Sequence, residues 1–166
     1  MEEILDKISS YNIFNYLLPG IVFSYILREI TTINIIQDDI IIGLFIYYFV
    51  GLIVSRIGST AIEPIFKKIR LLKFADYKDF INASKVDSKI NLFSEINNTY
   101  RTITSVAFSL LFVKFVLYLF SVLSLSIQLQ KIIGVIALFI LFAGAYRKQT
   151  NYITKRIKAA KGNNNT

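Results

Sequence analysis

Apolar residues in this chain gather in four blocks, over residues 11–27, 40–54, 106–127 and 132–146. A helix needs about 20 predominantly apolar residues to cross the hydrocarbon core of a bilayer, with a range of about 17–25. The third block has this length, and the other three reach it when their flanking residues are included. We therefore predict an all-α integral membrane protein with four transmembrane helices, joined between helices 2 and 3 by a helical cytosolic segment.

The same pattern divides the chain into two pairs of membrane helices, the segment between them and a tail. The parts are residues 1–54 (helices at about 11–30 and 40–56), 55–105, 106–147 (helices at about 104–128 and 131–147) and 148–166.

Basic residues are distributed unevenly between the two sides that this layout defines. The segment between the second and third blocks has nine Lys or Arg residues, and the chain after the fourth block has six. The two short loops have one each, Arg28 and Lys131. Because cytoplasmic loops carry an excess of Lys and Arg, we expect both termini and the central segment to be cytosolic.

The first block contains residues that are unusual in a membrane helix: Asn15 and the adjacent Pro19 and Gly20. In lipid, a proline frees a backbone carbonyl that a neighbouring helix or a polar side chain must satisfy. Asn15 lies four residues before Pro19, so its amide can bond across helices or to the loosened backbone. We expect a kink here, which serves either as a hinge or only for packing.

The segment 55–105 is predicted to be helical. The stretch STAIEPIFKKIRLLKF (residues 59–74) has the spacing of a capping box at Thr60 and Glu63, and Pro64 is best tolerated near a helix start. We therefore expect an amphipathic helix to begin at about residue 60.

A second helix is predicted from about residue 88 to residue 127, so that it joins the segment to the third block. An apolar stripe at helical spacing precedes the block, at Val86, Ile90, Phe93, Ile96, Tyr100 and Ile103. A helix of this length extends well beyond a bilayer. Its projecting stripe packs either on residues 60–83 of the same chain or on a neighbouring copy.

Lys114 lies near the middle of the third block, where an ionisable side chain costs at least about 2.5–3.5 kcal/mol. On a continuous helix, Tyr118, Ser121 and Gln128 share its face. A polar stripe on an apolar helix indicates a bundle interior or a water-filled path, and these four residues are our candidates for lining a pore. In the alternative interpretation, Lys114 reaches the cytosolic interface from a more deeply placed helix.

Basic residues beside the membrane form the candidate ligand site. They are Arg56, Lys67, Lys68, Arg70, Lys73, Arg147, Lys148, Lys155 and Arg156. Aromatic residues available for base stacking include Phe66, Phe74, Tyr77, Phe80 and Tyr152. The basic surface either lies on anionic lipid or binds a phosphate-rich ligand.

The chain has no Cys and no His. It therefore lacks disulfides, thiolate nucleophiles and imidazole bases, and we expect no metal site and no cofactor. Asp76, Asp79 and Asp87 are better explained as helix caps and solvated residues than as catalytic groups. We expect that the protein is not an enzyme.

The chain resembles the small four-helix membrane effectors of bacterial anti-phage defence systems, in particular the Hailong B type, which accompanies a nucleotidyltransferase. The resemblance lies in size, in hydrophobic layout and in the stretches FNYLLPG (residues 14–20) and INNTYRT (residues 96–102). It implies a homo-oligomeric pore in the inner (plasma) membrane, controlled from the cytosolic side by a nucleotide or oligonucleotide that a partner enzyme makes.

Our first hypothesis is therefore an oligomeric, ligand-gated channel that acts in antiviral defence, and we expect a tetramer. The alternative is a non-conducting membrane anchor that recruits a soluble cytosolic partner, with the polar stripe serving to hold helices together.

Overall fold

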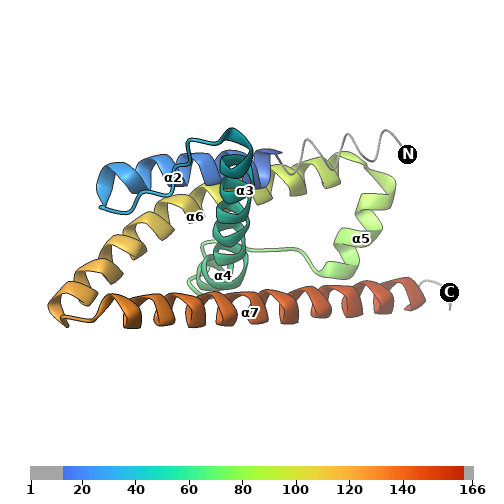
Figure 1. Ribbon diagram of the computed structural model, residues 1–166. Helices are drawn as coiled ribbons and strands as arrows, with labels where there is room; N and C mark the ends of the chain where they lie inside the picture. The colour runs from blue at the N-terminus through green and yellow to red at the C-terminus, as the bar shows by residue number, and fades with distance from the viewer. Residues whose placement is uncertain (1–12, 163–166) are drawn as a thin grey trace.

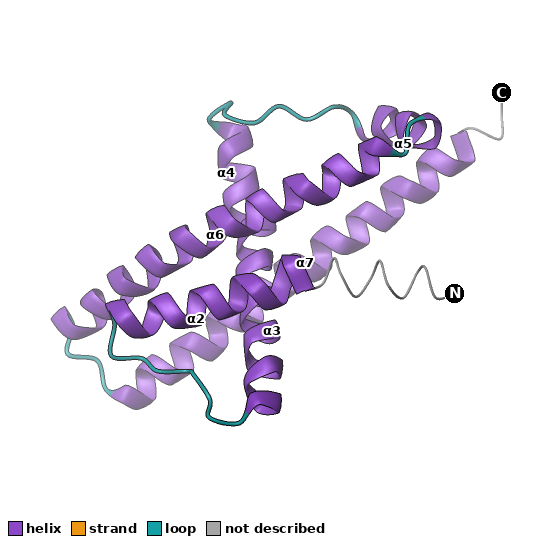
Figure 2. Cartoon of the chain, turned by 90° about the horizontal axis from the view of Figure 1, so that it is seen from above, coloured by secondary structure: helices purple, strands orange, loops and turns teal. Residues whose placement is uncertain are grey.

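The computed structural model describes residues 13–162, which form helices and connecting loops without any strand (Figures 1 and 2). The N-terminal residues 1–12, including the predicted helix start at 11, and the last four residues of the basic tail lie outside this description. The elements are η1 (Ile13–Leu17), α2 (Leu18–Ile30), α3 (Ile40–Ile57), η2 (Gly58–Ile62), α4 (Glu63–Lys68), α5 (Tyr77–Val86), α6 (Lys89–Val122) and α7 (Ile127–Gly162), where η denotes a π-helical segment.

Three helices in the described part of the chain are long and apolar enough to cross a membrane. They span Ile40–Lys68, Lys89–Val122 and Ile127–Ala160. The class predicted from the sequence, a helical protein with membrane-spanning segments, agrees with this finding. The fourth span at about 11–30 and the orientation of the chain in a membrane stay predictions.

The two longest helices, α6 and α7, diverge from the turn that joins them, and α5 lies across their open end (Figure 1). The continuous helix made of α3, η2 and α4 crosses α2, α6 and α7 at a steep angle in both views (Figures 1 and 2). The chain is therefore not a bundle of parallel helices, and its polar residues meet where the helices cross.

The crossing of α2 and α3 depends on two glycines. A Cβ atom on Gly20 would lie 1.7 Å from the backbone oxygen of Tyr47, and one on Gly51 would lie 1.8 Å from the backbone oxygen of Tyr16. Small residues let helix backbones approach closely, and here only glycine fits. Gly20, which we considered as part of a hinge, thus makes a direct contact between two helices.

Each of the two prolines follows a π-helical segment. Pro19 comes after η1 and Pro64 after η2, and both lie inside continuous helices. A proline ring clashes with the carbonyl four residues earlier, and a wider π-turn removes that carbonyl from the regular hydrogen-bond ladder. In η2 the N–H of Glu63 accordingly bonds the carbonyl of Gly58, five residues earlier.

The predicted helix start at Thr60 is therefore wrong. The Thr60 hydroxyl donates to the carbonyl of Arg56 (2.7 Å), as it does inside a helix, and Glu63 does not cap. The helix that begins at Ile40 continues to Lys68 and is followed by a loop in which Arg70 has a positive φ of 61°.

The predicted long helix after residue 88 is confirmed as α6, whose 34 residues give a length of about 51 Å. It ends at Val122, earlier than predicted, in a turn where Ser124 has a φ of 49°. Gln128 therefore belongs to α7, and the prediction that it shares a helix with Lys114 is wrong. Val86 likewise ends α5 and lies outside α6.

The apolar stripe of α6 is not covered by the described residues of its own chain. Phe93 is 63% exposed, Tyr100 67% and Ile103 55%. Packing of this stripe on residues 60–83 of the same chain is therefore not what the structure shows.

The apolar core is small, and it lies between α2, α3 and α6. Its buried members are Phe23, Leu27, Val54, Val106 and Leu110. Most other large apolar side chains of the described helices face outward, and none of the residues in the apolar window of α7 is buried. Such an apolar exterior fits lipid or further protein as its surroundings.

We predict unequal effects on stability for two glycine substitutions. Gly20→Ala drives a Cβ atom into the backbone of Tyr47 and should lower the free energy of unfolding by about 1–3 kcal/mol. Gly134→Ala, in α7, meets no atom within 4 Å and should be neutral or slightly stabilising, since alanine is the better helix former. Thermal unfolding of the purified protein in detergent measures both, and equal stability of the two variants would contradict this account of the crossing.

Candidate functional site

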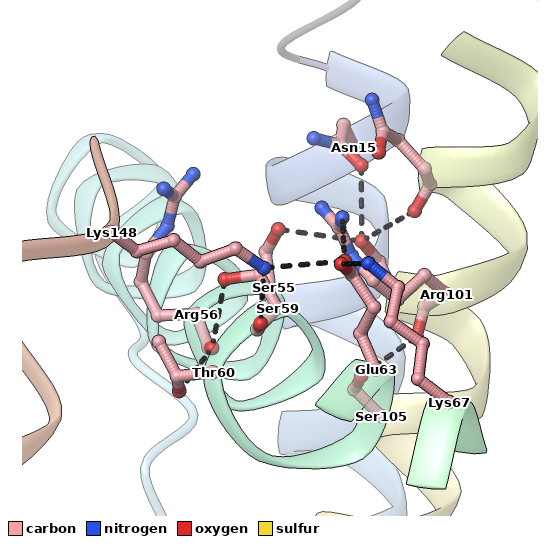
Figure 3. A network of polar contacts seen from close by, with 12 residues as sticks. Asn15, Ser55, Arg56, Ser59, Thr60, Glu63, Lys67, Arg101, Ser105 and Lys148 are labelled. Atoms are coloured by element: carbon pink, nitrogen blue, oxygen red, sulfur yellow. Dashed lines mark hydrogen bonds and ion pairs between the residues drawn. The ribbon is translucent and has the colours of Figure 1, made fainter. Parts of the chain in front are cut away.

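A buried carboxylate with three cationic partners lies at the centre of the molecule. The Glu63 side chain is only 6% exposed, and its Oε1 lies 2.9 Å from the Lys67 ammonium. Its Oε2 lies 3.1 Å from a guanidinium nitrogen of Arg101 and 3.3 Å from the Lys148 ammonium (Figure 3). Burying an ion is costly unless it is paired and hydrogen-bonded, and Glu63 meets both conditions.

The three cations reach Glu63 from three helices. Lys67 lies four residues later on α4, which places it on the same helix face. Arg101 comes from α6 and Lys148 from α7. Lys148 also donates a hydrogen bond to the backbone carbonyl of Ser59 in η2. A single carboxylate thus joins the α3–α4 helix to both α6 and α7.

A neutral polar network lies beside this cluster. The Thr102 hydroxyl lies 3.0 Å from Oδ1 of Asn15 and 3.4 Å from the hydroxyl of Ser55. All three side chains are fully buried. Of the two alternatives for Asn15, a bond across helices or to the loosened backbone, this contact is the first, and the stretches FNYLLPG and INNTYRT meet at it. A separate bond joins the neighbouring residues, in which the Arg56 guanidinium donates to the Tyr16 hydroxyl at 3.0 Å.

An open cavity of about 570 Å³ lies next to Glu63, between the α3–α4 helix, α5, α6 and α7. Five cations and two carboxylates are among its lining residues, which gives the lining an excess of positive charge. The charged residues are Arg56, Lys67, Arg101, Lys148, Lys155, Glu63 and Asp76.

Aromatic rings also line the cavity: Phe74, Tyr77, Phe80 and Tyr152. The rings of Tyr77 and Tyr152 have their centroids 6.3 Å apart, and the Lys67 ammonium lies 4.0 Å from the centroid of Phe74. Cations beside aromatic faces are the combination that binds phosphate together with a planar base.

Two arginines of the lining hold donors that no described residue satisfies. The Nε atoms of Arg56 and Arg101 are buried and have no hydrogen-bond partner in the described part of the protein. Buried donors are almost always paired, with an ion or water where protein groups do not serve. Each guanidinium bonds through a terminal nitrogen instead, Arg56 to the Tyr16 hydroxyl and Arg101 to the Glu63 carboxylate.

The structure brings four of the nine predicted ligand residues together. Arg56, Lys67, Lys148 and Lys155 line the cavity. The other five are exposed and lie outside its lining: Lys68, Arg70, Lys73, Arg147 and Arg156. Sequence reasoning missed Arg101, because it lies in the middle of a long helix and nothing local marks its partner. It also interpreted Glu63 as a helix cap.

The predicted pore residues lie elsewhere. Lys114, Tyr118 and Ser121 are exposed on the surface of α6, and Gln128 is exposed on α7. Lys114 forms no ion pair with the described residues of its own chain. Within one chain these side chains do not meet the cavity, so the described site and the polar stripe are separate features.

We predict that the Thr102 hydroxyl contributes more to stability than the hydroxyl of Thr104 on the same helix. Thr102→Val leaves the buried Asn15 oxygen without this donor and should lower the free energy of unfolding by about 1–3 kcal/mol. Thr104→Val, two residues later, removes an exposed hydroxyl that bonds only its own helix and should change stability by less than about 0.5 kcal/mol. Chemical denaturation in detergent tests the difference, and similar values for the two variants would contradict a structural role for the network.

No protein-family model, curated protein or solved structure matches the chain.

Proposed function

We propose that the protein is an oligomeric membrane pore, the effector of an anti-phage defence system, whose conductance is controlled by a nucleotide or oligonucleotide in the cavity beside Glu63. The charge distribution of the sequence supports a cytosolic position for that cavity. The resemblance of the layout to Hailong B-type effectors supports the role in defence.

The main support for a pore is the set of exposed polar residues on α6. Lys114, Tyr118 and Ser121 face away from the rest of the chain, and Tyr118 is 64% exposed. In contact with lipid, Lys114 alone would cost at least about 2.5–3.5 kcal/mol. A water-filled axis between copies of α6 removes this cost, because the ammonium then stays hydrated.

The spacing of exposed residues along α6 supports a ring of such helices. Phe93, Tyr100, Ala107, Lys114 and Ser121 recur at intervals of seven residues, and all are exposed. Residues seven apart lie on one face of a helix, so these five form an exposed stripe that is free to face neighbouring copies. A closed ring of identical chains is the usual form of such an assembly, and four copies is our proposed number.

The cavity supports control by a phosphate-bearing aromatic ligand. Its five cations provide charge-assisted hydrogen bonds for phosphate, and its four aromatic residues provide stacking surfaces for bases. The same cations also suit an anionic lipid headgroup.

The test is conductance of a Lys114 variant. Lys114→Leu removes the charge from the proposed axis and should change ion flux into liposomes by at least about tenfold, since a ring of charges sets the energy of a permeating ion. Lys85→Leu removes an exposed cation of α5 and should leave the flux unchanged. Both variants should elute from size-exclusion chromatography as the parent protein does.

Unchanged conductance in Lys114→Leu would contradict the proposed axis. If the parent protein shows no flux and a soluble partner is recovered with it, the non-conducting membrane anchor is the better account.

A further inference from the structure

Helix α7 is attached to the rest of the described chain over a short stretch. Its contacts gather around Ala145, which is 8% exposed, and at Lys148 and Tyr152. On the N-terminal side of this stretch, Phe142 stacks on Phe49 with ring centroids 6.1 Å apart. Most of the remaining helix surface is exposed. Through its ion pair with Glu63 and its hydrogen bond to the Ser59 carbonyl in η2, Lys148 is therefore a principal link between α7 and the α3–α4 helix.

The cations that hold Glu63 are also cations of the cavity. Lys67, Arg101 and Lys148 each pair with the carboxylate and each line the open space (Figure 3). One carboxylate carries a single negative charge, so three cations around it can accept more. A phosphate carries up to two negative charges and three acceptor oxygens, and it binds arginine with two parallel hydrogen bonds.

We propose that Glu63 is an internal stand-in for a ligand's phosphate, and that a phosphate entering the cavity takes Lys148 and Arg101 from it and so releases α7 from α4. This inference rests on the proposed control of the protein by an anion in the cavity. The exchange is intramolecular competition: the same donors bind the Glu63 carboxylate in one state and the phosphate in the other. We call the Lys148–Glu63 pair the latch, and the state in which it is formed the latched state.

Release of α7 reaches the proposed pore through the chain itself. Four residues, 123–126, join α7 to the end of α6 that carries Lys114, Tyr118 and Ser121. In this proposal a change in the angle of α7 moves this turn, and with it the end of α6.

The phosphate can come from a soluble nucleotide or from a lipid headgroup, and the experiment separates these sources. One arm uses protein in phosphatidylcholine nanodiscs with inorganic pyrophosphate in solution. The other arm uses nanodiscs that contain phosphatidylglycerol and no added pyrophosphate. In either arm the position of α7 is the quantity measured.

The chain has no cysteine, so one introduced thiol reports on α7 without interference. Ala145→Cys places it on the buried side of α7, beside the cavity, where a maleimide should react slowly while Lys148 pairs with Glu63. A ligand that only filled the cavity would slow this reaction further, so faster labelling reports movement of α7. Saturating pyrophosphate, or the anionic lipid, should raise this rate by on the order of tenfold or more, which corresponds to about 1.4 kcal/mol. Tyr146→Cys is the control, because Tyr146 is 78% exposed and its thiol should react equally fast in every state.

Two further variants distinguish competition from simple loss of structure. Glu63→Gln and Lys148→Met both break the link, so each, combined with Ala145→Cys, should speed labelling of the introduced thiol without any ligand. Their effects on pyrophosphate affinity should be opposite. Glu63→Gln removes the competitor and should bind pyrophosphate on the order of tenfold tighter, whereas Lys148→Met removes a donor and should bind it more weakly.

Pyrophosphate binding and the labelling rate together distinguish failure of the latch from failure of the ligand site. Pyrophosphate that binds without changing the labelling rate overturns the latch and leaves the ligand site standing. Weaker binding in Glu63→Gln shows that Glu63 orients the cations, which overturns the competition. If neither pyrophosphate nor anionic lipid has any effect, the proposed ligand control and the latch both fail. A latch that responds in a protein without ion flux supports this inference and overturns only the pore.

Discussion

The arrangement of helices depends on the buried carboxylate of Glu63. Three long helices contribute to its neutralisation: the α3–α4 helix through Lys67, α6 through Arg101 and α7 through Lys148. A buried charge without its partners is strongly unfavourable, so the helices must meet where these side chains reach one oxygen pair. The close approach of α2 and α3 at Gly51 lies twelve residues before Glu63 on the same continuous helix, and Ser55 of the Asn15–Ser55–Thr102 network lies between them in the sequence.

This interior gives the molecule an unusual distribution of polarity. Polar side chains such as Asn15, Ser55, Thr102 and Ser105 are fully buried, whereas many Ile, Leu and Phe residues are exposed. In water such an exterior would drive aggregation, but lipid is as apolar as these side chains. With little hydrophobic force between helices in a bilayer, hydrogen bonds, ion pairs and close contacts of small residues must determine how they pack. The buried network and the glycine contacts are of these kinds.

Local patterns in the sequence predicted the parts of the structure that local patterns govern. The apolar blocks and the stripe before the third block predicted helices, and the long continuous helix α6 is present. An amide in an apolar segment needs a partner, and of the two partners considered for Asn15, another helix or the loosened backbone, the structure shows a bond to another helix. Four of the predicted ligand residues share one cavity because the α3–α4 helix, which carries Arg56 and Lys67, meets α7, which carries Lys148 and Lys155. Pairing between distant helices was not predictable in this way. Nothing near Arg101 or Lys148 in the sequence indicates that both reach Glu63, and the π-turn that allows Pro64 inside a helix has no simple signature. The turn after Val122 separated Gln128 from Lys114 although no Gly or Pro marks it.

The exposed polar residues of α6 do not line the basic cavity, and we propose that an anion in the cavity controls conduction along them. Single-channel recording of the purified protein in planar bilayers, with short oligonucleotides and cyclic nucleotides added from one side and then the other, tests this claim most directly. The account predicts unitary currents that a nucleotide switches when it is present on the side of the cavity only. Currents that ignore every nucleotide on both sides, or no currents at all from correctly assembled protein, would contradict it.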